Sequence, residues 1–337
     1  MDITQLLNRL INQKNLTPAE TENFLFEVMK GEIASSQIAA ILTALRIKGE
    51  TPNEIFGFIQ AMRKQMVKVD ISDAIDVCGT GGDSSNSFNI STAVAFVVAG
   101  AGVKVAKHGN RAASSKCGSA DVLEALGVNI NISTIHAKKI LEKVGMVFHF
   151  APLFHPAIKQ VTTVRNELKI RTMFNFFGPF INPAAVAKQL VGVPNKEIAE
   201  KLILIGEKLN YKHLLIVTSD DGMDEISLSA KTQVLELKNN KIKRFIIDPQ
   251  EYGFKKIVKK DIQEGSLVQN ANFIREILNG IKGSRRDIVV LNSAVAFYAA
   301  DKVMDIKEGI KLAEESIDNG NAKKVLESLI KETQKYA

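Results

Sequence analysis

The chain has 337 residues, 45% of them apolar and 24% charged, which is enough for a sizeable core and two domains and excludes disordered and collagen-like chains. Its longest apolar run, Ala93 to Val103, has 11 residues, whereas a membrane span needs about 20, so we expect a buried core element and no membrane association. The formal net charge of +7 is compatible with nucleic acid, a membrane surface or a polyanionic small molecule as partner.

The N-terminal part of the chain predicts a small, all-helical domain over residues 1–70. Thr17-Pro18-Ala19-Glu20 and Thr51-Pro52-Asn53-Glu54 each offer a capping hydroxyl, a proline in the first turn and a glutamate that reaches back. The sequence starts with MDITQLLNRLIN, which lacks the charge and apolar pattern of a signal peptide, so we expect a cytoplasmic protein. Two cysteines without zinc-site spacing, Cys78 and Cys117, fit a reducing compartment.

From residue 71 to 337 the pattern changes to short β-rich runs that alternate with helical ones. This alternation predicts an α/β domain with a central, mostly parallel sheet flanked by helices. Part of the segment 160–190 looks helical and is expected to join the N-terminal helices, and the C-terminal segment predicts amphipathic helices. The predicted strands are Ala74–Cys78, Val103–Ala106, Met146–Phe150, His213–Val217, Thr232–Leu237, Ile242–Ile247 and Asp287–Leu291.

A glycine-rich stretch, Gly79-Thr80-Gly81-Gly82-Asp83, follows the first predicted strand. Glycines let the backbone approach a ligand closely, and successive N–H groups can point into one concavity. Asn89, Ser91 and Thr92 then stand at the start of an apolar helix, where free N–H groups favour an anion. Together these features predict an anion site, although a glycine-rich loop alone also fits a tight structural turn.

The second predicted strand ends in Lys107-His108-Gly109-Asn110-Arg111, and a stretch rich in hydroxyls leads to Ser119, which we expect to cap a helix. The carboxyl ends of neighbouring strands line the ligand crevice of open α/β sheets. Two such ends suited to anions predict a ligand with more than one phosphate. Taken alone, the second loop is equally compatible with an exposed polar loop.

Four carboxylates occupy the six positions from Asp220 to Glu225. They repel one another unless a cation lies among them, and Mg²⁺ prefers one or two carboxylates together with phosphate oxygens and water. The alternative is a solvated acidic turn. Beside two polyanion loops, the run predicts a Mg²⁺ site, and Asp83 is then expected to contact a sugar hydroxyl or a metal-bound water.

The stretch from Phe154 to Pro183 combines His155, Arg165, Arg171 and Asn175 with many aromatic residues. Apolar residues at helical spacing are mostly core, and arginines mostly lie on the surface. A substrate with a carboxylate on an aromatic ring would nevertheless favour one arginine in an otherwise apolar channel. His136 and His149 have no acidic or nucleophilic partner in the pattern and are expected to be ordinary residues.

Taken together, these motifs resemble the anthranilate phosphoribosyltransferase family over nearly the whole chain and in order. The matching motifs are Gly79–Asp83, Phe88–Thr92, Lys107–Arg111, Gly118–Asp121, Arg165, Arg171, Phe174-Asn175, Gly178-Pro179, Asn182-Pro183 and Asp224-Glu225. The chain departs from the family pattern at Ser84, where glycine is usual, and at Ser87, where threonine is usual. Lys169 and His149 also replace a usual glycine and a usual apolar residue.

The resemblance implies a helical domain that is hinged to the α/β domain, and a homodimer that meets through the helical domains. It also implies a reaction of tryptophan biosynthesis, in which the phosphoribosyl group of phosphoribosyl pyrophosphate (PRPP) is transferred to the amine of anthranilate. Mg²⁺ is implied at Ser91, Asp224 and Glu225. Anthranilate is implied at Gly79, His108, Asn110, His155 and Arg165, with Lys107 and Arg165 as the catalytic residues. The residues implied for PRPP are Gly79, Gly82, Asp83, Ser87, Asn89, Ser91, Thr92, Lys107, Ser115 and Ser119.

Two alternatives remain open from the residues. A nucleoside phosphorylase would share the architecture and also break a bond at ribose C1, but the Asp224-Glu225 pair and the Asn110/Arg165 set favour the transferase. A nucleic-acid-binding protein of the same fold would use the net charge and the pairs Lys255/Lys259 and Lys256/Lys260, whose spacing places each pair on one helical face. A solvated face explains these lysines better, so nucleic acid is not the expected partner.

Overall fold

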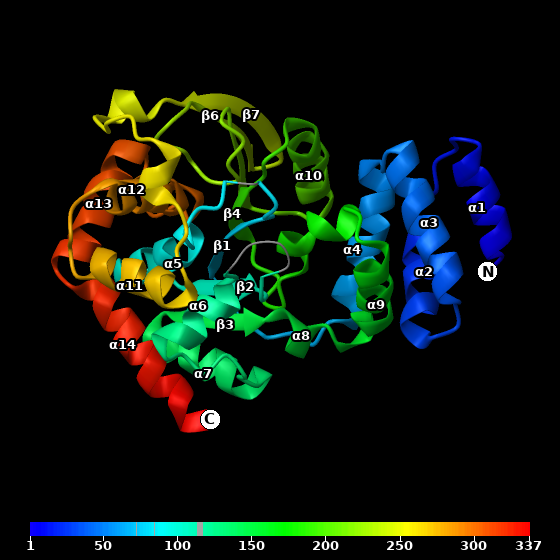
Figure 1. The fold of residues 1–337 in the computed structure, drawn as a ribbon, viewed down its shortest axis with the longest axis horizontal. Helices are drawn as coiled ribbons and strands as arrows, with labels where there is room; N and C mark the ends of the chain where they lie inside the picture. Colours follow the sequence, from blue (N-terminus) through cyan, green and yellow to red (C-terminus); the bar gives the residue numbers. More distant parts are fainter. Residues whose placement is uncertain (72, 84, 113–116) are drawn as a thin grey trace.

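The computed structural model describes residues 1–71, 73–83, 85–112 and 117–337. Four helices come first, on one side of the molecule: α1 (Ile3–Ile11), α2 (Pro18–Lys30), α3 (Ser35–Lys48) and α4 (Pro52–Gln65) (Figure 1). Both predicted capping boxes are present, since the Thr17 and Thr51 hydroxyls accept from the N–H groups of Glu20 and Glu54, and each glutamate accepts from the threonine N–H. These caps explain where α2 and α4 begin.

A seven-stranded sheet in the order β3-β2-β1-β4-β5-β6-β7 forms the centre of the larger part. The first five strands in this order are parallel to one another, β6 is antiparallel to β5, and β7 is antiparallel to β6. The prediction of a mostly parallel sheet is therefore confirmed. The strands are β1 (Ile75–Gly79), β2 (Val105–Gly109), β3 (Met146–Phe150), β4 (Lys188–Gly192), β5 (His213–Ser219), β6 (Thr232–Lys238) and β7 (Lys241–Ile247).

Helices cover both faces of this sheet. Because side chains alternate along a strand, Leu215 and Val217 of β5 belong to one hydrophobic core, while Leu214 and Ile216 belong to the other. The first core lies among α5, α12 and their neighbours, and the second lies beneath α10 and the N-terminal helices. The helices of this part are α5 (Ile90–Gly100), α6 (Ser119–Leu126), α7 (Thr134–Val144), α8 (Ala151–Phe154), α10 (Lys196–Lys208), α11 (Leu267–Leu278), α12 (Ser284–Ala299), α13 (Ile306–Asp318) and α14 (Asn321–Thr333).

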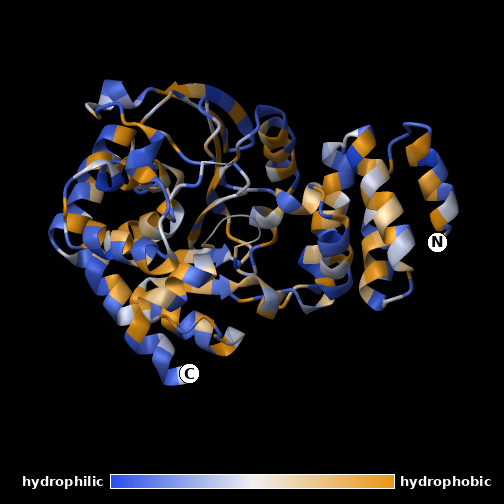
Figure 2. Ribbon diagram, in the orientation of Figure 1, coloured by the Kyte–Doolittle hydropathy of each residue, from blue (hydrophilic) through white to orange (hydrophobic). Residues whose placement is uncertain are grey.

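The hydropathy of the helices follows their position. Orange and blue alternate along the outer helices, such as α1 and α2, because one face of each is buried and the other is solvated (Figure 2). Helix α5 is different, since every residue from Thr92 to Ala99 is buried between the sheet and α12, α13 and α14. Its continuous apolar sequence is thus explained by burial on all sides.

The segment after β3 returns to the N-terminal helices. Helix α9 (Lys159–Leu168) packs against α2 and α3, and its Val161 and Val164 lie in the same core as those helices (Figure 1). A short 3₁₀ turn, η1 (Pro156–Ile158), precedes α9, and two more, η2 (Met173–Asn175) and η3 (Gly178–Ile181), connect α9 to β4. The remaining 3₁₀ turns occur later in the chain: η4 (Pro249–Tyr252), η5 (Lys259–Ile262) and η6 (Gln334–Tyr336). A domain boundary at residue 70 stays a prediction.

One predicted strand is wrong, and one strand was not predicted. Asp287–Leu291 lies inside α12, where its β-branched run is buried on all sides, and a short apolar run cannot by itself distinguish a strand from a buried helix. Conversely, β4 was not predicted, although it lies between β1 and β5. In addition, β2 extends to Gly109, so Lys107 and His108 belong to the strand and not to the loop.

Candidate active site at the ends of β1 and β2

The glycine loop after β1 is in close contact with the acidic loop after β5. Gly81 and Gly82 have φ values of +73° and +72°, which favour glycine. A Cβ added to Gly79 would lie 2.3 Å from Asp224 Oδ2, and one added to Gly192 would lie 1.5 Å from the carbonyl oxygen of Asp224. Gly79 and Gly192 therefore leave room for Asp224. The neighbouring Ser84, where the family has glycine, lies outside the described residues.

Three acidic residues meet at this point. The Gly81 N–H donates to Asp224 Oδ2 at 2.7 Å, and the Asp224 N–H donates to Asp83 Oδ2 at 3.4 Å. Burial, with the negative charge of Asp83, raises the pKa of Asp224 to about 7. Burial and the charge of Asp224 raise the pKa of Glu225 well above its usual value. Such a group of buried like charges favours a cation among them.

Asp220 and Asp221, the other two acids of the run, have structural partners. Asp220 pairs with Lys196 at 2.9 Å, and Asp221 accepts from the Ser227 hydroxyl at 2.7 Å. The solvated-turn alternative therefore describes these two residues, whereas Asp224 is buried next to the glycine loop.

Lys107 lies beside these acids, in the interior. Its side chain is buried, and its Nζ donates to the Val77 carbonyl at 2.5 Å and to the Ser91 hydroxyl at 3.1 Å. Its positive charge opposes the rise in the pKa of Glu225. Strand β2 thus brings the predicted lysine to the start of α5, next to a predicted metal ligand.

Polar atoms without partners occur just after β1 and at the start of α5. Asn89 precedes the helix, and its Nδ2 donates to the Cys117 carbonyl at 3.0 Å. Its Oδ1, Thr80 Oγ1 and Thr92 Oγ1 are buried and have no hydrogen-bond partner among the described residues. Buried polar atoms are nearly always satisfied in native proteins. We therefore expect a bound ligand to supply the missing partners. Ser87, at the edge of this region, contacts Ser85 at 3.2 Å and bridges to Gln263.

The loop after β2 brings Asn110 and Ser119 together, since the Ser119 hydroxyl donates to the Asn110 carbonyl at 3.3 Å. The prediction that Ser119 caps a helix is wrong by one position: Gly118 is the cap of α6, and Asp121 accepts from its N–H at 2.9 Å. The Ser119 hydroxyl is thereby left at the loop. Ser115, predicted to contact PRPP, lies outside the described residues.

Three buried histidines lie in β2 (His108), in β3 (His149) and directly after α8 (His155). The rings of His108 and His155 have centroids 5.3 Å apart, and His149 is the neighbour of His108 in the sheet. Burial lowers the pKa of His149 and His155 to about 4 and that of His108 well below its usual value, so all three are neutral at pH 7. His108 Nε2 and both ring nitrogens of His149 and His155 have no partner within the described parts of the chain.

Arg165 lies on α9, with its guanidinium 5.6 Å from the centre of the Phe174 ring. Burial lowers its pKa, and no hydrogen bond or ion pair holds this guanidinium in residues 1–71, 73–83, 85–112 and 117–337. Within the same ranges no hydrogen bond joins it to Asn110. The structure therefore brings His108 close to His155, and Asn110 close to Ser119, while Arg165 lies on α9 beside Phe174.

Three residues at or near the site have contacts that the sequence did not predict. Asp76 is a buried acid within β1, Thr80 carries an unsatisfied hydroxyl, and Arg171 donates to the Gly82 carbonyl at 2.5 Å. An acid inside an apolar strand was a readable signal for Asp76. Arg171 stands among the family motifs, but no pattern indicated that it would hold the glycine loop.

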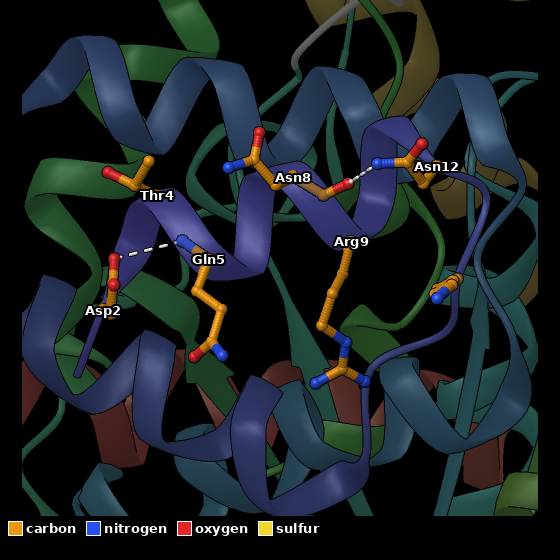
Figure 3. Close-up of a pocket in the computed structure, with 7 residues that line it drawn as sticks. Asp2, Thr4, Gln5, Asn8, Arg9 and Asn12 are labelled. Atoms are coloured by element: carbon orange, nitrogen blue, oxygen red, sulfur yellow. Dashed lines mark hydrogen bonds between the residues drawn. The ribbon is translucent and has the colours of Figure 1, made fainter.

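A separate hollow lies on α1, far along the chain from these loops (Figure 3). Its lining comes from one helix and the turn after it: Asp2, Thr4, Gln5, Asn8, Arg9, Asn12 and Lys14. Arg9 is already paired with Glu20 and donates to the Asn15 carbonyl at 2.6 Å. This hollow therefore has the charge pattern of ordinary solvated surface, and we assign the candidate site to the strand ends.

The residues present fit a metal only in part. No group of three or more His, Cys, Asp or Glu side chains in the described residues is placed to hold a metal ion. Asp224 and Glu225 supply two carboxylates, and Mg²⁺ commonly takes one or two carboxylates and completes its shell with substrate phosphates and water. The donor set thus fits a metal that binds together with a phosphorylated ligand.

The lysines around residue 257 do not form the basic helical face considered above. The 3₁₀ turn η5 begins only at Lys259, so Lys255 and Lys256 lie outside it, and neither pair shares a helix. In addition, no helix within the described ranges has the length and hydropathy required to span a membrane.

Comparison with known proteins gives a consistent picture. Residues 4–66 match the helical bundle domain and residues 71–323 the a/b domain of the glycosyl transferase family. Anthranilate phosphoribosyltransferases of Dehalococcoides mccartyi and Clostridium beijerinckii are 46% and 48% identical, over 99% and 98% of both chains.

Solved structures agree. The chain is similar to the crystal structure of anthranilate phosphoribosyltransferase from Thermus thermophilus, with a TM-score of 0.91, 36% identity and coverage of 99% of this chain and 100% of that one. It is also similar to the Saccharomyces cerevisiae enzyme in complex with PRPP and Mg, with a TM-score of 0.91, 28% identity and coverage of 99% and 98%. The chain therefore belongs to the anthranilate phosphoribosyltransferase family of glycosyl transferases.

Proposed function

We propose that the ends of β1 and β2, with the loop after β5, form the site at which this family member transfers the phosphoribosyl group of PRPP to the amine of anthranilate. The products are N-(5-phosphoribosyl)anthranilate and pyrophosphate. Two contacts carry the proposal: Asp224 of the loop after β5 bonds to Gly81 of the glycine loop, and Lys107 of β2 bonds to Ser91 at the start of α5. An anion cradle, an acidic pair and a lysine are what a magnesium-bound pyrophosphate requires.

For PRPP, the proposal assigns the glycine loop and the start of α5 to its phosphates and ribose. The unsatisfied Asn89 Oδ1 and Thr92 Oγ1 support this assignment because they lack partners in the described structure. Asp83 accepts from the Ser85 N–H through Oδ1 at 3.1 Å and from the Asp224 N–H through Oδ2 at 3.4 Å, and the remaining lone pairs of its carboxylate are able to accept from a sugar hydroxyl. The assigned residues are Gly79, Gly82, Asp83, Ser87, Asn89, Ser91, Thr92, Lys107, Ser115 and Ser119.

For Mg²⁺, we assign Asp224, Glu225 and the Ser91 hydroxyl as ligands. The raised pKa values of both acids support this because they reflect like charges in a buried place. A bound Mg²⁺ would neutralise charge on the phosphates and on the departing pyrophosphate. The S. cerevisiae relative has been solved with PRPP and Mg, which is consistent with the assignment.

For anthranilate, we assign Gly79, His108, Asn110, His155 and Arg165. The Arg165 guanidinium has no anionic partner among the described residues and would attract the substrate carboxylate. His108 and His155 are neutral, so they offer a ring nitrogen without adding charge next to an uncharged amine. The S. cerevisiae relative has also been solved with 4-fluoroanthranilate.

The chain's residues need only position the substrates and stabilise charge. Pyrophosphate leaves C1 of the ribose, positive charge develops there, and the amine attacks from the opposite face. The amine carries a free lone pair at neutral pH, so a strong general base is not required. Lys107, in the interior beside Ser91, would stabilise the charge that develops on the leaving group, and Arg165 would orient the acceptor.

The direct experiment follows the loss of anthranilate fluorescence with and without PRPP and Mg²⁺. Loss that requires both supports the proposal, whereas loss with phosphate and a nucleoside would favour a phosphorylase. Asp224→Asn and Glu225→Gln are expected to lower turnover and to shift the Mg²⁺ titration to higher concentrations. An unchanged Mg²⁺ titration in both variants would contradict the metal assignment.

Three further features are proposed with this function. The N-terminal helices and α9 form one unit that moves against the α/β part. Two copies of the chain form a homodimer through this unit, which is supported by the exposed Ile11 and Ile47 on α1 and α3. A cytoplasmic location is consistent with a biosynthetic reaction on soluble metabolites. Sedimentation velocity of the wild type and of Ile47→Asp tests the dimer: a monomeric wild type contradicts it.

A further inference from the structure

A buried carboxylate at the centre of β1 has no part in the function described so far. Asp76 is fully buried, and both of its oxygens accept hydrogen bonds. Oδ1 accepts from the backbone N–H of His108 at 3.3 Å. Oδ2 accepts from Asn182 Nδ2 at 2.9 Å and from Gln189 Nε2 at 3.1 Å. The Cys78 thiol lies 3.8 Å from the same oxygen.

The partners of Oδ2 lead to the segment around η3. Gln189 Nε2 also donates to the Pro179 carbonyl at 2.9 Å. Asn182 Nδ2 also donates to the Ala106 carbonyl at 2.8 Å, and its Oδ1 accepts from the Ala184 N–H at 2.9 Å. One carboxylate oxygen thus fixes the polypeptide between Pro179 and Ala184.

The partner of Oδ1 belongs to the neighbouring strand β2. The His108 N–H is adjacent to Lys107, whose ammonium group contacts Ser91 at the start of α5. His108 itself is one of the residues assigned to anthranilate. One carboxylate therefore bridges the strand that carries Lys107 and the segment that follows η2, in which Asn182 lies 106 positions after Asp76.

Stability alone does not explain this acid. Burial raises the pKa of Asp76, and the charge of Lys107 together with the Asn182, His108 and Gln189 donors opposes that rise. Every hydrogen-bond partner is a donor, which is the pattern that an ionised carboxylate requires. Replacement of buried ionic groups by apolar ones is often neutral or stabilising, so an acid in a central strand implies a specific requirement for geometry.

We propose that Asp76 is a positioning residue that sets the distance between two walls of the site, β2 with Lys107 and His108 and the segment 179–184. The inference rests on the proposed function, in which Lys107 contacts PRPP and His155, assigned to anthranilate, lies beside the second wall, where the Ile181 backbone influences its pKa. The reaction joins two bound molecules, and a small misplacement of one wall against the other lowers the rate of such a reaction steeply.

Asparagine provides a sharp test because it has the same shape but only one accepting oxygen. If the oxygen of this asparagine faces Asn182 and Gln189, its NH₂ group faces the His108 N–H, and two donors oppose each other. If the amide is turned round, its NH₂ group faces the side-chain NH₂ groups of Asn182 and Gln189 instead. Asp76→Asn therefore cannot satisfy both walls at once. We expect it to raise KM for both substrates and to lower kcat/KM by at least about tenfold, the effect of losing one hydrogen bond to a charged group.

Gln189→Met tests the contacts of Asp76 to one wall while its contact to the other wall is kept. It removes the donor to Asp76 Oδ2 and to the Pro179 carbonyl but leaves the His108 contact in place. We expect KM for anthranilate to rise, with KM for PRPP within about twofold of the wild-type value. A structural role alone would lower thermal stability and change both constants equally or not at all.

Glu236→Gln is the matched control. Glu236 is a buried acid in the same sheet that accepts from Tyr298 at 2.8 Å and contacts His213, the first residue of β5, at 3.1 Å. Glu236 lies in β6, and its partner His213 begins β5, at the end opposite the loop that carries Asp224. We expect it to lower the melting temperature without a change in either KM.

Hydrogen exchange measured by mass spectrometry on the apoprotein tests the positioning without any assay. In Asp76→Asn we expect faster exchange both in peptides that cover 105–110 and in peptides that cover 177–185, while Glu236→Gln accelerates neither. Unchanged KM values in Asp76→Asn, or exchange that changes in only one of the two segments, overturns the proposal. If the wild type lacks PRPP-dependent consumption of anthranilate, the proposed function fails, and the exchange data still decide whether Asp76 joins the two walls.

Discussion

The carboxylate of Asp224 accepts a hydrogen bond from the backbone N–H of Gly81 at 2.7 Å, although the two residues are 143 positions apart in the chain. The loop after β5 and the loop after β1 are therefore one structure. A change in either loop is transmitted to the other, which makes the site sensitive to small changes at its glycines.

Added methyl groups at two of these glycines should have different effects. In Gly192→Ala the Cβ would lie 1.5 Å from the backbone oxygen of Asp224, and in Gly79→Ala it would lie 2.3 Å from a side-chain oxygen. Because a side chain moves more easily than backbone, we expect Gly192→Ala to be the worse of the two. Melting temperature and specific activity of both variants measure this, and a more damaging Gly79→Ala would contradict the packing described.

Thr92 offers a test of the unsatisfied hydroxyl. Its buried Oγ1 has no partner in the described structure, so Thr92→Val should leave the stability of the apoprotein unchanged or raised, while KM for PRPP rises about tenfold. Thr21→Val is the control, because Thr21 Oγ1 donates to the Pro18 carbonyl at 3.1 Å, away from the site. It should lower the melting temperature and leave both KM values unchanged. The reverse pattern would show that Thr92 serves packing only.

Arg165 and Arg171 should act on different substrates. Arg165 packs on Phe174 with its charge unpaired among the described residues, whereas Arg171 donates to the Gly82 carbonyl of the glycine loop. We expect Arg165→Ala to raise KM for anthranilate about tenfold or more, and Arg171→Ala to raise KM for PRPP instead. Steady-state kinetics with each substrate varied in turn measure both constants. Equal effects on both substrates in Arg165→Ala would count against its role.

His149 should contribute to the acid sensitivity of the fold. Burial lowers its pKa to about 4, below the 6.5 of a solvated histidine, so between these values the unfolded chain binds the proton and the folded chain does not. Stability from this group is present above pH 6.5 and is lost as the pH falls toward 4, by roughly 3 kcal/mol over the whole interval. His149→Leu should therefore flatten the acidic limb in urea unfolding from pH 7 to 4.5. A parallel pH profile in the variant would refute this assignment.

Local patterns identified most of the sheet and the motifs of the site, but not how they meet. The prolines, threonines and glutamates at the starts of α2 and α4 specify local caps, and both caps formed as expected. Strand β4 was missed because it begins with the polar pair Lys188-Gln189, and its central position depends on register with β1, where Gln189 lies beside Asp76. Contacts between distant segments also explain why the hydrogen bonds of Asp76 and Arg171 could not be predicted from the sequence.

The opposite error occurred at Asp287–Leu291, where a β-branched run lies in a helix because tertiary burial overrides local preference. Within the site, the sequence indicated which residues can carry charge but not which of them are buried away from solvent. The neutral state of His108 and His155 follows from burial by segments distant in the chain, which no local window contains.

The second hydrophobic core has a thermodynamic consequence. Phe24 and Phe58 of the N-terminal helices lie in the same cluster as Leu202 of α10 and Ile216 of β5. The four helices therefore complete a core that the sheet begins, and neither part encloses its apolar surface alone. Heating should melt the chain in one cooperative calorimetric transition, and a fragment ending at residue 66 should be unable to hold its structure by itself.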